Sequence, residues 1–225
     1  MGIKLIDVKN EVLSSNDDLA DELRSQLKSH NVFVVNIMAS PGAGKTTLLL
    51  NTINQLKDEL RIAVIEGDIE SMVDAEKIVA SGAKAVQIRT GGDCHLDAPM
   101  LKPAIDSLDL DSIDIIFIEN IGNLVCPAEF DTGAMLKVML LSVPEGDDKV
   151  LKYPLMFSVC DGLLITKTDC ASMFDFDMEK LKKRVQLLNP KLHIIPLCAK
   201  TGENTNTWIQ WLKEQRDAYL GLQRG

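Results

Sequence analysis

Residues 32–47 read Val-Phe-Val-Val-Asn-Ile-Met-Ala-Ser-Pro-Gly-Ala-Gly-Lys-Thr-Thr. The first seven of them are apolar except for one asparagine, and small residues and glycine follow at once. A short apolar run bounded in this way is typical of a strand buried within a parallel sheet. From Thr46 to Leu60 the apolar residues then recur at helical spacing. The stretch therefore predicts a buried strand, a tight turn rich in glycine, and a helix.

The turn has the composition of a phosphate-binding loop. Small residues allow backbone N–H groups to curl around phosphate oxygens, and the start of the next helix adds its positive end. A lysine can then reach the β- and γ-phosphates, and a hydroxyl can reach Mg²⁺. Ala39 stands where the strict pattern has glycine, so a positive φ there would be strained. The alternative is an ordinary strand-to-helix turn. The residues predicted to contact a nucleotide are Gly42, Ala43, Gly44, Lys45, Thr46 and Thr47.

The rest of the chain alternates between short apolar runs and segments of helical periodicity. Strands are expected at residues 62–65, 85–88, 113–118, 134–141, 162–165 and 193–198. Helices are expected at residues 15–30, 73–81, 98–107, 177–188 and 205–221. The first helix is expected to start at Ser15 as its N-cap. This alternation predicts an α/β fold of the P-loop class, a mostly parallel sheet with helices on both faces. Residues 144–149 are typical of a turn or hairpin loop.

Length and charge limit the kinds of protein this chain can be. No linker divides the 225 residues, so residues 1–225 are expected to form a single domain, with residues 1–30 as a helical extension. The net charge of −9 argues against nucleic acid or an anionic membrane as partner. No apolar run approaches the length that spans a membrane. Five cysteines, an odd and low number, favour a reducing compartment, so we expect a cytoplasmic protein.

Two acidic residues follow predicted strands, where open α/β sheets bind ligands. Asp68 follows the strand at 62–65, and Glu119 ends the apolar run before it. Each carboxylate could hold Mg²⁺ or orient an attacking water, so Lys45, Asp68 and Glu119 are the catalytic candidates. The alternative is that each is a turn or helix-cap residue. Gly122 ends a segment similar to the Asp-x-x-Gly switch of GTPases, and its amide is suited to sense a γ-phosphate.

A base-recognition element is predicted after the strand at 162–165. Thr166-Lys167-Thr168-Asp169 is similar to the Asn-Lys-x-Asp element of GTPases, with Thr in place of Asn. Asp169 would accept hydrogen bonds from the N1–H and amino group of guanine, donors that adenine does not offer in that arrangement. The stem of Lys167 would cover the base. Further on, Cys198-Ala199-Lys200 parallels the Ser-Ala-Lys element that contacts the guanine oxygen. The combination favours GTP over ATP.

A thiol and imidazole cluster is the third candidate site. Cys94 and His95 are adjacent, and Cys126 follows the strand that ends near Glu119. Both segments are predicted loops at strand ends, so they could meet. Two thiols and an imidazole suit Zn²⁺ or Ni²⁺. Three ligands do not close a tetrahedron, so a second subunit or water would complete the site. The alternative is that these are small buried residues beside an unrelated histidine.

With these motifs in place, the chain resembles the HypB family of hydrogenase nickel-incorporation GTPases, from about residue 15 to the end. The most specific segments are residues 91–98 and 119–127. The resemblance implies a SIMIBI-like P-loop fold and a homodimer that forms when GTP binds. It also implies that Cys94, His95 and Cys126 bind Zn²⁺ or Ni²⁺ at the subunit interface. The implied partners are the nickel chaperone HypA and the hydrogenase large subunit precursor.

The beginning of the sequence differs from those family members that carry an N-terminal cysteine motif or a histidine-rich stretch. Residues 1–31 hold no cysteine and one histidine, so a high-affinity nickel motif there is not supported. Three other functions stay open. A urease-accessory GTPase would have a Cys-Pro-His motif, whereas no histidine follows Cys126-Pro127. A P-loop small-molecule kinase would tolerate ATP. A metal sensor or store would bind metal without turning over GTP.

Overall fold

The computed structural model describes residues 8–68 and 73–222. Within these residues, seven strands form one sheet in the order β3-β2-β4-β1-β5-β6-β7. Every neighbouring pair is parallel, which confirms the predicted α/β class. The strands are β1 (Phe33–Ala39), β2 (Ile62–Asp68), β3 (Lys84–Arg89), β4 (Ile115–Gly122), β5 (Leu136–Ser142), β6 (Gly162–Thr166) and β7 (His193–Pro196).

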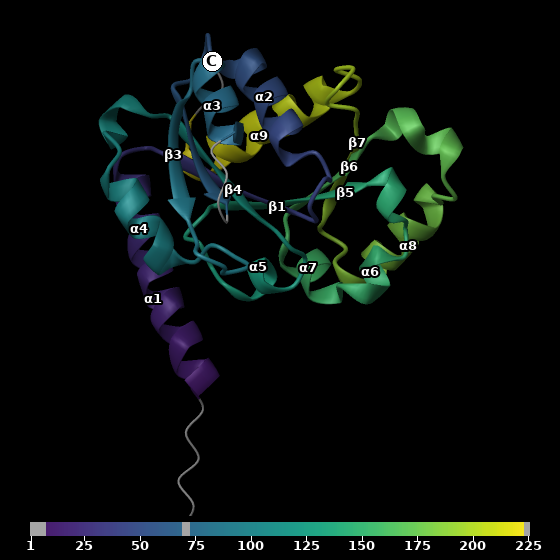
Figure 1. The fold of residues 1–225 in the computed structure, drawn as a ribbon, viewed down its shortest axis with the longest axis horizontal. Coiled ribbons are helices and arrows are strands. Elements are labelled where there is room, and N and C mark those ends of the chain that lie inside the picture. Colours follow the sequence, from purple (N-terminus) through teal and green to yellow (C-terminus); the bar gives the residue numbers. More distant parts are fainter. Residues whose placement is uncertain (1–7, 69–72, 223–225) are drawn as a thin grey trace, which may run out of the picture.

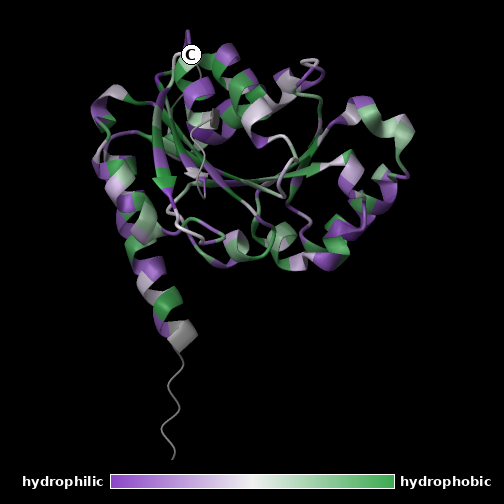
Figure 2. Ribbon diagram, in the orientation of Figure 1, coloured by the Kyte–Doolittle hydropathy of each residue, from purple (hydrophilic) through white to green (hydrophobic). Residues whose placement is uncertain are grey.

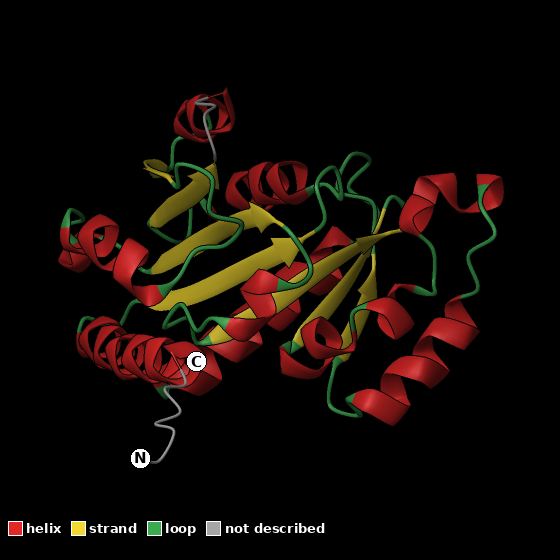
Figure 3. Ribbon diagram, turned by 60° about the horizontal axis from the view of Figure 1, so that its bottom comes forward, coloured by secondary structure: helices red, strands yellow, loops and turns green. Residues whose placement is uncertain are grey.

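Helices cover both faces of this sheet (Figures 1 and 3). The α-helices are α1 (Val8–Ser29), α2 (Lys45–Leu56), α3 (Val73–Ala80), α4 (Ala98–Asp106), α5 (Cys126–Glu129), α6 (Lys149–Lys152), α7 (Pro154–Val159), α8 (Met178–Leu188) and α9 (Thr205–Leu220). Short 3₁₀ turns are η1 (Leu110–Ser112), η2 (Val143–Glu145) and η3 (Thr168–Met173). Among the described residues, no helix has both the length and the apolar character needed to cross a membrane.

The apolar core lies on both sides of the sheet, and Figure 2 shows hydrophobic residues concentrated on the central strands. All seven residues of β1 are buried, as a central parallel strand requires. On one face, α2, α3 and α9 pack on alternate strand residues such as Val35 and Phe117. On the other face, α1 and α4 pack on residues such as Val34 and Ile116. Helices α6, α7 and α8 cover the β5–β6 part of that second face. The helices cover the two faces of the sheet, so loops surround the carboxyl ends of the central strands.

The first helix begins earlier than the sequence predicted. It starts at Val8, so Ser15 lies inside the helix and is not its N-cap. Residues 8–14 contain no glycine or proline, so nothing in their backbone chemistry stops the helix from extending. The second half of α1 is part of the core, through Leu23 and Leu27. The first half projects from the body of the protein (Figure 1). Residues 1–7 of the expected extension lie outside the described residues.

Two other predictions are corrected by the structure, one of a strand end and one of a loop type. Strand β4 continues past the apolar run to Gly122, because its pairing with β1 resumes at Ala39 after an irregularity. Glu119 is therefore inside a strand and does not end it. The turn expected at residues 144–149 is present, but it is not a hairpin loop, since β5 and β6 are parallel neighbours. The segment instead contains the end of η2 and the start of α6, and α6 and α7 make the crossover to β6.

Gly162, at the start of β6, lies against the indole ring of Trp211 on α9. A Cβ at this glycine would lie 2.5 Å from Cη2 and 2.8 Å from Cζ3 of that buried ring. We therefore expect Gly162→Ala to lower the free energy of unfolding by about 1–3 kcal/mol, measured by urea denaturation. Trp211→Leu removes the obstacle, so the two losses should not add in the double variant. Losses that add would show that the contact is not responsible.

Candidate functional site

The loop between β1 and α2 has the backbone conformation that the sequence predicted for glycine. Gly42 and Gly44 have φ of +76° and +102°, the left-handed region that other residues rarely adopt. Helix α2 then begins at Lys45. Ala39 has no positive φ and pairs within β1, so its replacement of glycine introduces no strain. The loop therefore leads directly into a helix N-terminus, whose positive end favours an anion.

A cavity of about 340 Å³ lies beside this loop and brings together the three catalytic candidates, Lys45, Asp68 and Glu119. Gly122 lines the same cavity. The hydroxyl of Thr46 donates a hydrogen bond of 2.9 Å to Oε1 of Glu119. Hydroxyl and carboxylate oxygens are the ligands that Mg²⁺ prefers, so these residues fit that ion. Residues 69–72, directly after Asp68, lie outside the described residues.

Glu66 is a further carboxylate in this cavity, and sequence reasoning missed it. It is buried in β2 and pairs in register with Glu119 of β4. Two acidic residues at matching positions of neighbouring parallel strands place their side chains on the same face of the sheet. The available signal was an acidic residue directly after the apolar run of β2. The sequence instead favoured Asp68 as the Mg²⁺ or water-orienting residue, because Asp68 stands at the strand end.

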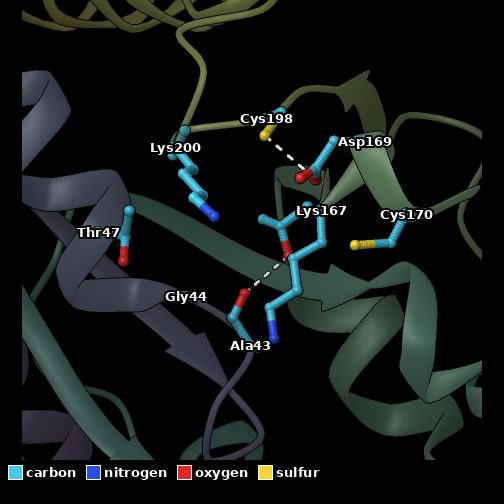
Figure 4. A pocket seen from close by; sticks show the side chains of 10 residues that line it. Ala43, Gly44, Thr47, Lys167, Asp169, Cys170, Cys198 and Lys200 are labelled. Carbon is cyan, nitrogen blue, oxygen red and sulfur yellow. Dashed lines mark hydrogen bonds between the residues drawn. The ribbon is translucent and has the colours of Figure 1, made fainter.

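The second cavity, of about 320 Å³, contains the predicted base-recognition residues (Figure 4). The thiol of Cys198 donates a 3.2 Å hydrogen bond to Oδ1 of Asp169. Thr166 donates through its hydroxyl to the carbonyl of Ala43, at 2.7 Å, and so ties the base element to the phosphate loop. This bond gives the departure from asparagine a structural role. The predicted residues that line the cavity are Ala43, Gly44, Thr47, Lys167, Asp169, Cys198, Ala199 and Lys200.

The thiol and imidazole cluster forms as the spacing suggested. Among the described residues, the ligand atoms of Cys94, His95 and Cys126 all lie within 4.8 Å of one another. The two sulfur atoms are 2.7 Å apart, and Sγ of Cys94 lies 4.0 Å from Nδ1 of His95. All three side chains are at least partly exposed. The hydrogen bond with Cys94, together with partial burial, raises the pKa of the Cys126 thiol. The two thiols and the imidazole are soft and borderline ligands that solvent can reach, so they suit Zn²⁺ or Ni²⁺.

A phenyl ring fixes the imidazole of this cluster. Phe130, just after α5, stacks on His95 with ring centroids 3.9 Å apart and an interplanar angle of 21°. No sequence signal indicated this contact, since the two residues are 35 positions apart. The other two histidines have different partners: His30 contacts Asp111, and His193 stacks on Trp211.

We expect Phe130→Leu to weaken Ni²⁺ binding by about tenfold, the low end of what loss of an outer partner of a metal ligand costs. Leucine keeps an apolar side chain but cannot stack flat on the imidazole, so His95 gains freedom that binding must remove. Titration with Ni²⁺, followed by calorimetry, measures the change. Phe174→Leu, on a half-exposed phenylalanine after η3, is the matched control. Equal affinities in Phe130→Leu and the wild type would show that the stack has no such effect.

The parallel sheet, the glycine loop and the two cavities define a P-loop nucleotide-binding protein. The family model described as "CobW/HypB/UreG, nucleotide-binding domain" matches residues 33–196. The hydrogenase maturation factor HypB of Escherichia coli strain K12 is 45% identical over 215 residues, which cover 96% of this chain and 74% of that protein. The chain therefore belongs to the CobW/HypB/UreG family, and within it to the HypB hydrogenase maturation factors.

Two solved structures are similar along nearly the whole chain. HypB from Helicobacter pylori in complex with nickel gives a TM-score of 0.87 at 38% identity, covering 92% of this chain and 97% of that one. HypB from Archaeoglobus fulgidus gives a TM-score of 0.84 at 39% identity, covering 91% of this chain and 100% of that one. Both agree with the seven-stranded parallel sheet of the described residues.

Proposed function

We propose that this protein binds and hydrolyses GTP and uses the nucleotide state to control the binding and delivery of nickel during hydrogenase maturation. The observation that carries the proposal is the path of β4 and the segment after it. Glu119 lies in the phosphate-side cavity, and Cys126 of the metal cluster follows it by only seven residues. A shift of this segment on GTP binding would move a metal ligand.

Selection of GTP rests on the second cavity. Asp169 would accept hydrogen bonds from guanine, Lys167 would cover the base, and the backbone at Ala199 would face the guanine oxygen. The hydrogen bond from Cys198 already fixes one oxygen of the Asp169 carboxylate. A held carboxylate penalises adenine, because its lone pairs would face no donor. This favours GTP over the ATP that a small-molecule kinase would use.

Hydrolysis rests on the first cavity. Lys45 would neutralise charge on the β- and γ-phosphates, and the amides of the glycine loop would hold their oxygens. Thr46 and Glu119 are the residues placed to hold Mg²⁺, with Asp68 or Glu66 contributing directly or through water. The ion would supply neutralisation of the charge that develops on the phosphates. A carboxylate left outside its coordination would orient the attacking water.

The metal cluster would carry nickel as cargo, with Zn²⁺ as the competing ion. Three ligands leave a tetrahedral site incomplete, so we propose that two copies meet at the cluster when GTP is bound. A homodimer of this kind would take nickel from the chaperone HypA and pass it to the hydrogenase large subunit precursor. We also propose that residues 1–225 form one cytoplasmic domain, which the continuous sheet of the described residues and the five free thiols support.

Turnover and light scattering test this proposal together. The purified protein should hydrolyse GTP faster than ATP, and Lys45→Ala should lose hydrolysis. A non-hydrolysable GTP analogue, but not GDP, should raise the mass in solution to that of a dimer. Equal use of both nucleotides would favour a kinase. Nickel binding without any GTP turnover would favour a metal sensor or store.

A further inference from the structure

Two asparagines join β4 and its extension to the metal-ligand loop. Nδ2 of Asn123 donates a 3.2 Å hydrogen bond to the carbonyl of Cys94, and its Oδ1 accepts one of 2.9 Å from the amide of Val125. A single carboxamide thus holds the backbone of one metal ligand and the backbone just before another, Cys126. It therefore joins the two backbone segments that carry the thiols.

Asn120 makes the second connection, from within the sheet. Its side chain is 1% exposed. Oδ1 accepts hydrogen bonds from the amides of Leu96, at 3.0 Å, and Ile121, at 2.9 Å. Nδ2 donates to Oδ1 of Asn36 on β1, at 3.2 Å. The residue after His95, Leu96, is therefore bonded to β4 and, through Asn120, connected to β1, the strand that leads into the phosphate loop. A buried amide with each of these bonds made has one low-energy orientation, because losing any of them leaves a polar group unpaired.

The same short segment also contacts the nucleotide loop. Thr46 binds Glu119, the residue before Asn120. Gly122, the residue before Asn123, packs so closely on Pro41 that a Cβ would lie 2.8 Å from its Cγ. On the neighbouring strand, Gly67 meets the side chain of Leu96, 2.8 Å from where its Cβ would be. Contacts to the phosphate loop and contacts to the metal loop alternate along residues 119–123, so movement on one side reaches the other.

We propose that Asn120 and Asn123 are positioning residues that transmit the nucleotide state to the metal ligands. When the phosphate loop changes its hold on Glu119 and Gly122, the two carboxamides carry that displacement to Cys94 and His95, and thus change the geometry offered to nickel. The inference rests on the proposed function, since it names the residues through which GTP and nickel act on each other. The coupling runs both ways, as linkage requires.

Asn123→Ala is the decisive variant, because its partners can turn to solvent and the fold should remain. Ni²⁺ affinity is measured by the thiolate-to-nickel absorption band, with GDP and with a non-hydrolysable GTP analogue. In the wild type the two affinities should differ by about fivefold or more, the usual lower limit of such coupling. In Asn123→Ala this ratio should fall close to one, while the affinity with GDP changes by less than about threefold. Asn54→Ala, on the exposed side of α2, is the matched control.

Asn120→Asp gives a second reading, since the carboxylate keeps both accepted bonds but replaces the donation to Asn36 with a buried, charged acceptor that faces Oδ1 of Asn36. It should reduce the ratio in part. A ratio that survives in Asn123→Ala, or a loss of affinity equal in both nucleotide states, overturns the inference and leaves the proposed function standing. Equal wild-type affinities with GDP and with the GTP analogue would overturn the nucleotide–nickel coupling in the proposed function, and the inference with it.

Discussion

Asp169→Asn should lower the affinity for GTP by at least about 100-fold, because a site built to pair with a polar group strongly rejects a mismatch. The carboxylate offers two acceptors to the two donors of guanine, the N1–H and the amino group. An asparagine turns one of these acceptors into a donor, which then faces the amino donor. The same donor suits the 2-oxo group of xanthine, so the variant should gain affinity for XTP as it loses affinity for GTP. Fluorescent-nucleotide titration measures both.

The exchange of specificity separates a changed site from a damaged one. A variant that had lost its fold would bind neither nucleotide. Asp175→Asn, a few residues beyond η3, makes the same chemical change outside the cavity lining and should leave GTP binding as it is. If Asp169→Asn still binds GTP as well as the wild type, the base is not held in this cavity.

Cys126→Ala should weaken Ni²⁺ binding by more than about 100-fold. Loss of a hydrogen-bond partner of a metal ligand costs up to about 100-fold, and loss of the ligand itself should cost more. Removing this sulfur leaves Cys94 and His95, two ligands from adjacent residues of one loop. Equilibrium dialysis gives the affinity. Cys170→Ala removes a thiol that lies outside the cluster and should not change nickel binding. Undiminished binding in Cys126→Ala would place the nickel ligands elsewhere.

The same substitution should separate the metal function from the nucleotide function. Cys126 opens α5, outside both nucleotide cavities, so GTP binding in the absence of metal should persist in Cys126→Ala. Dimer formation that needs nickel should be lost. A variant that fails to bind GTP would instead indicate that α5 supports the phosphate-side cavity.

The sequence predicted those features that depend on residues close together in the chain. The strand, glycine turn and lysine at residues 33–45 define the nucleotide loop without reference to anything distant. The alternation of apolar runs and helical segments likewise predicted the parallel sheet. Cys94 and Cys126 both lie in loops predicted at strand ends, where they could meet, and the structure brings them together.

What the sequence did not reveal depends on register and on side-chain packing. Glu66 became visible as a site residue only once β2 and β4 were aligned beside each other. Asn120 follows Glu119 in β4, after the apolar run, and its carboxamide finds its partners on β1 and beside His95 only in the folded chain. No sequence pattern indicates the stack of Phe130 on His95. Such contacts arise from tertiary structure, which periodicity does not encode.

We propose that the nucleotide site and the metal cluster act on each other. The effect of Ni²⁺ on nucleotide affinity tests this coupling. The affinity for a non-hydrolysable GTP analogue is measured without metal and with saturating Ni²⁺, in the wild type and in Cys126→Ala. If the two sites are coupled, Ni²⁺ should change this affinity in the wild type and leave it unchanged in Cys126→Ala. An affinity that Ni²⁺ does not alter in the wild type would contradict it.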